Sequence, residues 1–152
     1  MGEKRRNTRT FEVERTTGSH EILDRLFVYG TLRQGQTARS LVANQISRCE
    51  PAWTIGSIYA FPMGHPGFLE GDGTGRVQGE VVWLTDLAAT FGLLDAYEGA
   101  DFARVIRKVT LDATNEQIWA WVYTLADPAA VKFGTRIEHG DWVRYWTEQD
   151  QG

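Results

Sequence analysis

The sequence is poor in the residues that build disulfides and metal centres, with one cysteine and three histidines among 152 residues. The lone Cys49 cannot form an internal disulfide, and its neighbour Glu50 would raise the pKa of the thiol, which does not favour a nucleophile. His20, His65 and His139 lack the i, i+4 spacing of a helical metal site, and we expect them in turns or at the surface. The sequence therefore predicts no metal site and no cofactor.

Long hydrophobic runs are also missing. No apolar stretch approaches the roughly 18 residues that span a bilayer, and the chain begins with charged residues instead of an apolar signal segment. We therefore expect a cytoplasmic protein without membrane contact. The formal charge of −4 argues weakly against a nucleic-acid partner, because phosphate binding needs a concentrated positive surface. The basic cluster from Lys4 to Arg9 lies among glutamates and fits a solvated tail better than a binding surface.

The composition is that of one globular domain, with 42% hydrophobic and 24% charged residues. A chain of this length buries about 68–70% of its extended surface on folding, so it can hold a core without covalent staples. Residues 1–22 are polar and lack sustained apolar periodicity, which predicts an N-terminal extension. We expect the packed domain at 23–147, a short tail at 148–152, and a monomer or small homo-oligomer.

Apolar patterning predicts strands with irregularly inserted helices. Leu26 to Tyr29 forms a buried strand that stops at Gly30, and Asp86 or Thr85 caps a helix that ends near Gly99. The other expected elements are a short helix at 37–44, a strand at 52–61 bent at Gly56, a functional loop at 62–75, a strand at 77–84, and a hairpin of 104–111 with 117–125. The pattern at 137–146 does not decide between helix and loop. The order predicts an α+β fold with a mixed or mostly antiparallel sheet of about five to six strands, which can curl into a barrel.

The turn after the first strand is the first candidate site. Gly30, in the segment Tyr29 to Arg33, allows a tight turn in which successive N–H groups point into one space, where they could hold a carboxylate or an oxyanion. A full dinucleotide or Walker phosphate motif does not follow the strand. An ordinary structural turn explains the same residues and stays open.

Glu98 is the second candidate. A carboxylate at a helix C-terminus meets the negative end of the helix dipole, which disfavours its charge and should raise its pKa. A raised pKa suits a general base near neutral pH. An exposed glutamate at the end of a helix is also common, so a purely structural role stays open.

Two motifs in order resemble the γ-glutamylcyclotransferase-like family. The first is Phe27-Val28-Tyr29-Gly30-Thr31-Leu32-Arg33, and the second is Leu94-Asp95-Ala96-Tyr97-Glu98-Gly99. Supporting pieces follow in the family's order: Pro66-Gly67, Val77-Gln78-Gly79-Glu80-Val81, Arg104 and Trp121-Val122-Tyr123. The resemblance runs from about Leu26 to Trp142 and implies a small mixed barrel flanked by helices.

The resemblance also implies a reaction, the release of 5-oxoproline from a small-molecule γ-glutamyl compound. Carried over residue by residue, it assigns Glu98 as the acid/base. It assigns substrate binding to Tyr29, Gly30, Thr31, Leu32, Arg33 and Tyr123, with Arg33 either holding the substrate α-carboxylate or lying at the surface.

Phe102 departs from the family pattern, which often has a tyrosine two residues before the arginine corresponding to Arg104. A hydroxyl available to substrate is therefore missing. Two alternatives to the cyclotransferase stay open: a non-catalytic small-molecule binding domain with the same pocket, and an amide hydrolase or acyltransferase.

Overall fold

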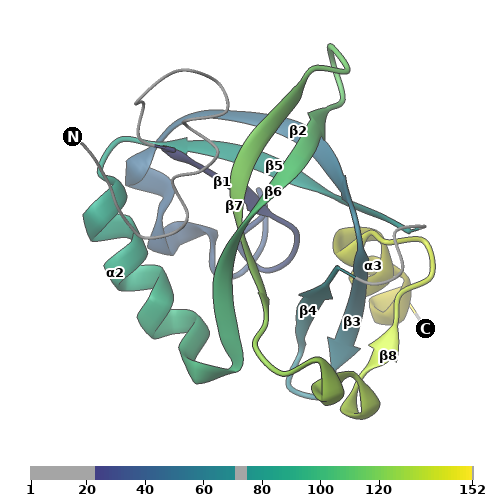
Figure 1. Ribbon diagram of the computed structural model, residues 1–152. Coiled ribbons are helices and arrows are strands. Elements are labelled where there is room, and N and C mark those ends of the chain that lie inside the picture. The colour runs from purple at the N-terminus through teal and green to yellow at the C-terminus, as the bar shows by residue number, and fades with distance from the viewer. Residues whose placement is uncertain (1–22, 71–74, 152) are drawn as a thin grey trace.

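The protein is described here by a computed structural model that covers residues 23–70 and 75–151 (Figure 1). Five strands close into a barrel in the order β1-β5-β2-β6-β7. Their bounds are β1 Arg25–Val28, β2 Ile46–Ile55, β5 Arg76–Leu84, β6 Phe102–Leu111 and β7 Gln117–Leu125. A second sheet has the order β4-β3-β8, with β3 Ser57–Phe61, β4 His65–Leu69 and β8 Thr135–Arg136.

A single parallel pairing closes the barrel. Leu26 of β1 lies beside Trp121 of β7, whereas the other neighbouring strands of the barrel run antiparallel. The expected α+β fold with a mixed, mostly antiparallel barrel is therefore confirmed, including the expected hairpin of β6 and β7.

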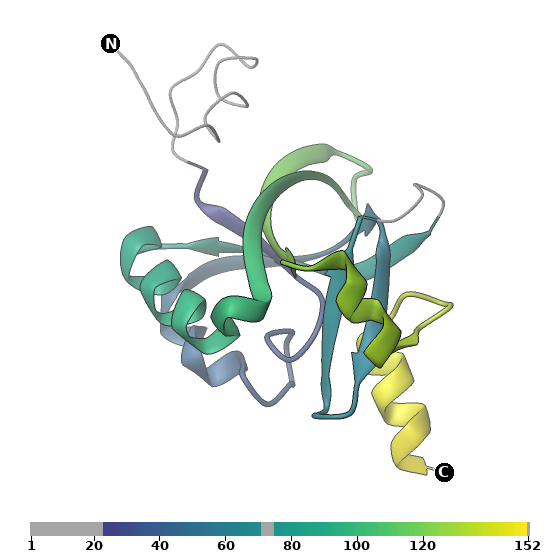
Figure 2. The same ribbon diagram turned by 60° about the horizontal axis from the view of Figure 1, so that its bottom comes forward.

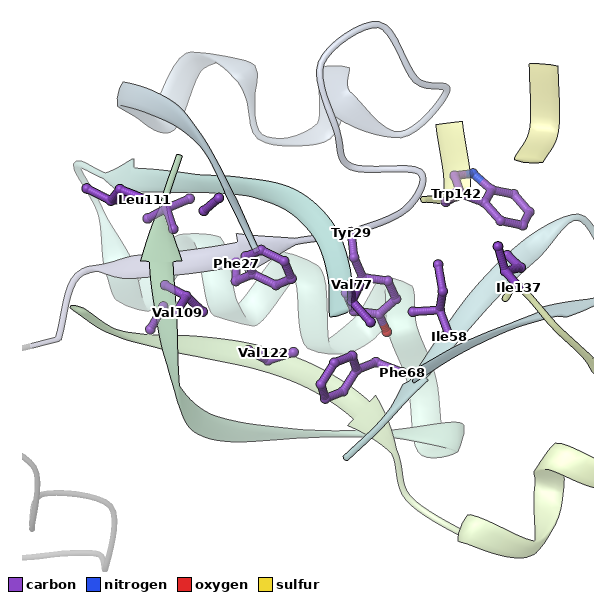
Figure 3. Close-up of a cluster of buried hydrophobic side chains, with 13 residues drawn as sticks. Phe27, Tyr29, Ile58, Phe68, Val77, Val109, Leu111, Val122, Ile137 and Trp142 are labelled. Carbon is purple, nitrogen blue, oxygen red and sulfur yellow. The ribbon is translucent and has the colours of Figure 1, made fainter. Parts of the chain in front are cut away.

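The run from Leu26 to Tyr29, which covers β1 after Arg25 and the residue that follows it, is apolar because both of its faces are buried. Phe27 and Tyr29 belong to the cluster inside the barrel, which Figure 3 shows together with Val122 of β7. Leu26 and Val28 point the other way, into a second cluster that includes residues of the helix α2. Alternation along a strand sends successive side chains to opposite faces, so a strand between two apolar layers reads as an unbroken apolar run.

The helix α2 spans Leu87–Glu98 and lies along one side of the barrel, opposite the small sheet (Figure 2). Its N-terminus is capped by Asp86, whose side chain accepts a hydrogen bond from the amide of Ala89 at 3.1 Å. Phe91 and Leu94 are buried against the barrel. The helix ends where Gly99 adopts a φ of 75°, a conformation that glycine tolerates at no steric cost.

The expected loop at 62–75 is wrong at His65–Leu69, which forms the strand β4, while positions 71–74 of that loop lie outside the described residues. This strand lies at the edge of its sheet and pairs with β3 alone, which is where a proline such as Pro66 can be accommodated. Gly67 is required by close packing, since a Cβ there would lie 2.6 Å from Leu125 Cδ2. The bend at Gly56 is confirmed, and it separates β2 from β3.

Two further stretches differ from the sequence expectation or complete it. The expected helix at 37–44 is instead a pair of short 3-10 turns, Arg39–Leu41 and Ala43–Gln45. Further 3-10 turns are formed by Gly99–Asp101 and Pro128–Phe133. The undecided C-terminal region forms the helix α3, Trp142–Gln151. In the described part of the chain, neither α2 nor α3 has the length and apolarity needed to span a membrane.

Candidate active site

A cavity of about 540 Å³ lies where the turn after β1, the end of α2 and the start of β4 meet. Both sequence motifs reach it: the first contributes Tyr29 to Leu32, and the second contributes Tyr97 and Glu98. The remaining lining residues are Phe27, Val28, Thr37, Met63, Gly64, His65, Pro66, Asp101, Phe102 and Tyr123. The fold thus brings together two segments that lie more than 60 residues apart, as expected of a binding site.

In the turn after β1, the carbonyl groups of Gly30 and Thr31 are engaged, whereas two of the amides have no acceptor among the described residues. The carbonyl oxygen of Gly30 accepts from the amide of Arg33 at 3.0 Å, and that of Thr31 accepts from Ala38 at 2.9 Å. A trans peptide directs its C=O and N–H in opposite directions, so the amides of Thr31 and Leu32 point away from these bonds. Neither amide donates to an acceptor among the described residues. Two N–H donors are therefore available at the wall of the cavity.

Gly30 allows the turn to pack against β4. A Cβ at this position would lie 2.4 Å from Cγ of Pro66, much closer than a side chain can approach. Glycine therefore serves here for close approach, which lets the turn and Pro66 share one wall of the cavity.

Glu98 is half-buried and one of two carboxylates among the described residues that line the cavity. Burial raises its pKa to about 7. The sequence predicted that the helix dipole would raise this pKa, whereas in the structure the cause is the loss of solvent around the carboxylate. A carboxyl group with this pKa can accept and return a proton near neutral pH.

Two tyrosines lie close to Glu98 and are held by hydrogen bonds. Tyr29 donates to the carbonyl oxygen of Tyr123 at 2.7 Å, and the Tyr123 hydroxyl donates to Oδ1 of Asp95 at 2.6 Å. Burial raises the pKa of both phenols, and the negative charge of Glu98 adds to each shift. Both hydroxyls thus stay protonated at neutral pH, and each donates its hydrogen to an acceptor other than Glu98.

Asp95 and Arg104 were not singled out as site residues from the sequence. Arg104 donates to both oxygens of Asp95, at 2.9 and 3.2 Å, and this pair holds the acceptor for Tyr123. Both residues lie in the motifs quoted above, but their pairing depends on how α2 and β6 pack. The only sequence signal was their place in those motifs.

Arg33 is not among the residues that line the cavity. Its Nη1 donates to Oδ1 of Asp141 at 2.8 Å, and its Nε lies 3.8 Å from Oε2 of Glu80. The guanidinium charge is thus matched by two carboxylates behind the turn. This arrangement does not support the expected contact of Arg33 with a substrate carboxylate.

The structure adds lining residues that sequence reasoning missed. His65, expected in a turn or at the surface, begins β4 and stacks on Phe61 with ring centroids 5.6 Å apart. Phe102 meets His65 edge to face at a centroid distance of 6.2 Å, and it lines the cavity where the family pattern often has a tyrosine. Thr31 and Tyr97 share a hydrogen bond of 3.0 Å at the same cavity.

Cys49 stays outside the cavity lining. Burial raises the pKa of its thiol, and the carboxylate that contributes is Glu80 instead of the expected Glu50. Within residues 23–70 and 75–151, no cluster of three or more His, Cys, Asp or Glu side chains is arranged to hold a metal ion.

The fold is a mixed barrel, and its cavity is lined by the turn after β1 and by the half-buried Glu98. The family model for gamma-glutamyl cyclotransferase, AIG2-like, matches residues 26–144. The chain belongs to this family. A search among curated proteins found no match.

Solved structures show the same fold. YkqA from Bacillus subtilis is similar over 86% of this chain and 44% of its own, with 25% identity and a TM-score of 0.68, so this chain spans less than half of that protein. An AIG2-like protein from Mus musculus matches over 80% of this chain and 89% of its own, with 21% identity and a TM-score of 0.64. PH0828 from Pyrococcus horikoshii matches over 84% and 96%, with 23% identity and a TM-score of 0.61.

Proposed function

We propose that this protein is a γ-glutamyl cyclotransferase that releases 5-oxoproline from a γ-glutamyl amine or amino acid, with Glu98 as its acid/base. One observation carries the proposal: a carboxyl group with a pKa of about 7 shares a cavity with two N–H donors that have no protein acceptor among the described residues. The family membership supports the reaction class.

The reaction needs no nucleophile from the protein, because the substrate carries one. The α-nitrogen attacks the γ-carbonyl carbon, a five-membered lactam forms, and the bond from that carbon to the leaving nitrogen breaks. Two protons leave the α-ammonium group, and two reach the leaving nitrogen, which departs as an ammonium ion. Glu98 would carry these protons, and a cavity that holds the γ-glutamyl chain folded would supply proximity.

The amides of Thr31 and Leu32 would stabilise the negative charge that develops on the γ-carbonyl oxygen. Donors fixed in the turn before the reaction require no reorganisation at the moment of attack. The phenols of Tyr29 and Tyr123 would shape the wall next to Glu98 without competing for its protons, since each hydroxyl already donates to a protein oxygen.

The experiment is to incubate the purified chain with a panel of γ-glutamyl amines and amino acids and to measure 5-oxoproline. Glu98→Gln keeps the shape of the side chain but cannot carry a proton, and we expect a rate loss of about 10²–10⁴-fold. Asp101→Asn is the matched control because it removes the other cavity carboxylate; we expect it to change KM and to keep turnover.

Two results would contradict the proposed reaction, and a third would contradict the role of Glu98. One is the absence of 5-oxoproline across the panel, which would favour a binding domain with the same pocket. The other is release of free glutamate in place of 5-oxoproline, which would indicate an amide hydrolase that uses external water. A full rate in Glu98→Gln would remove Glu98 from the mechanism.

A further inference from the structure

Four charged side chains gather behind the turn that lines the cavity. They are Arg33 and Arg39, which flank the turn, Glu80 of β5, and Asp141 at the start of α3. Their side chains are only 13%, 17%, 12% and 28% exposed, respectively. We call this group the turn clamp. Two positive and two negative charges balance within it, as expected for charges that are largely withdrawn from solvent.

Glu80 is the centre of the turn clamp. Its Oε1 accepts from the amide of Gln34 at 3.0 Å and from Nη1 of Arg39 at 2.9 Å. The same Nη1 of Arg39 lies 3.3 Å from the carbonyl oxygen of Leu32. One carboxylate therefore holds the backbone of the turn directly at Gln34 and indirectly at Leu32.

Asp141 fixes the other end of the group. Its Oδ1 accepts from Arg33 at 2.8 Å and from the amide of Arg144, in the first turn of α3, at 3.2 Å. It therefore caps α3 and binds the turn at the same time. The turn is therefore held by side chains from two other parts of the fold, Glu80 of β5 and Asp141 at the start of α3.

The turn clamp binds backbone groups of the turn other than the amides of Thr31 and Leu32, namely the Gln34 amide and the Leu32 carbonyl. Leu32 directs its carbonyl to Arg39, and Gly30 and Thr31 direct theirs to backbone amides. With these groups bound on the far side, the amides of Thr31 and Leu32 are left for the cavity. We infer that Glu80 is a positioning residue, which through the turn clamp holds the amides of Thr31 and Leu32 in the geometry that stabilises the reacting carbonyl; this inference rests on the proposed function.

The first test measures turnover. Donors that act on the developing charge contribute mainly in the transition state, so Glu80→Ala should lower kcat by about 10- to 100-fold while KM changes by less than about threefold. Glu80→Gln keeps an oxygen that can accept from Gln34 and should recover part of the loss. Glu70→Ala is the control, because it removes a 2.9 Å contact with Arg107 outside the cavity lining, and its kcat should match the wild type.

The second test measures how well the turn is held by its hydrogen bonds and does not depend on enzymatic activity. Amide hydrogen exchange of Gln34 should become at least about tenfold faster in Glu80→Ala, whereas exchange in β6 and β7 should stay as in the wild type. An unchanged Gln34 amide, or a rise in exchange that is equal across the barrel, would overturn the inference. If the wild type forms no 5-oxoproline, the proposed function fails, and this measurement still decides whether Glu80 holds the turn.

A purely structural role makes a different prediction for the same variants. It would lower the melting temperature of Glu80→Ala while the folded fraction kept the wild-type kcat. An unchanged kcat per folded molecule would therefore overturn the positioning role of Glu80.

Discussion

Glu98 combines a proton-carrying side chain with an environment that disfavours its charge. Glu98 is the last residue of α2 and lines the same cavity as the turn after β1, and burial there raises its pKa to about 7. A base with this pKa is half ionised at neutral pH, where small changes in pH alter the fraction able to accept a proton. The same environment that prepares the group for proton transfer also costs stability when the group is ionised.

The pH dependence of turnover should therefore report Glu98. We expect kcat/KM to rise about tenfold per pH unit on the acid side and to level off above a midpoint of about 7, because only the ionised carboxylate can take the proton. Steady-state rates from pH 5 to 9 measure this profile. The Asp101→Asn control should keep the same midpoint, and a midpoint near 4.5, the ordinary value, would show that the acid limb does not come from a buried Glu98.

The pH dependence of stability has the opposite sign. The native state keeps the Glu98 proton up to about pH 7, whereas the unfolded chain loses it near 4.5, so the native state loses stability as pH rises between these values. Glu98→Gln removes this loss. We expect the variant to exceed the wild type by up to roughly 3 kcal/mol in free energy of unfolding at pH 8, with the difference vanishing below about pH 4.5.

Denaturant unfolding of both proteins at pH 4 and pH 8 measures this difference. The two proteins should be equally stable at pH 4, where glutamate is neutral in both the native and the unfolded state. A variant less stable than the wild type at pH 8 would mean that ionised Glu98 is stabilised by its surroundings.

At the scale of elements, the turn after β1 works because of its fit against β4. Gly30→Ala places a Cβ 2.4 Å from Cγ of Pro66, and either the turn or β4 must move. We expect a loss of about 1–3 kcal/mol in unfolding free energy, as for other overpacked sites, together with lower turnover because the amides of the turn shift. Thermal unfolding and the 5-oxoproline assay measure both effects.

Gly92→Ala is the matched control on another element. This glycine lies inside α2, and a methyl group added there would have no neighbour within 4 Å other than its adjoining residues and the backbone of its own helix. Alanine in a helix interior should stabilise the protein by about 0.5–1 kcal/mol and leave turnover unchanged. If both variants behaved alike, close packing at Gly30 would not be what requires glycine.

Local signals in the sequence predicted the elements that depend on local interactions. Each of these signals comes from residues within or next to its own element: the apolar run of β1, the Asp86 cap of α2, and the alternation of β6 and β7. The strand β4 was missed because Pro66 and Gly67 usually mark turns, and only an edge position in the second sheet makes them acceptable in a strand.

The candidate site likewise has a part that the sequence predicted and a part that it did not. Its backbone turn and Glu98 could be recognised from local chemistry and from the resemblance. The environment of Arg33 could not, because its partners Glu80 and Asp141 lie 47 and 108 positions along the chain and meet it only through the packing of β5 and α3. The position of His65 in the cavity likewise depends on β4, which the sequence did not reveal.

At the scale of the whole molecule, residues 1–22 are polar and lack sustained apolar periodicity, whereas Leu23 accepts a hydrogen bond from Trp121 Nε1 at 3.0 Å. We predict that a chain starting at Leu23 keeps the fold and the turnover of the full chain. Thermal unfolding and the 5-oxoproline assay on both chains measure this.

A chain that starts at Tyr29 is the control. It lacks β1, so β5 and β7 lose the strand that joins them, and we expect no cooperative unfolding transition. A loss of turnover already in the chain that starts at Leu23 would assign residues 1–22 a part in function and contradict the predicted division of the chain.

Barrel closure has a consequence for how the protein acquires its function during folding. The Tyr29 hydroxyl, directly after β1, and the Tyr123 carbonyl of β7 that it binds are 94 residues apart, and β1 meets β7 in a parallel pairing. Contacts this distant in sequence raise the contact order and form late, after the hairpin of β6 and β7 has assembled. A nascent chain therefore has no complete cavity until β7 has left the ribosome, and in refolding the recovery of turnover should coincide with the slowest structural phase.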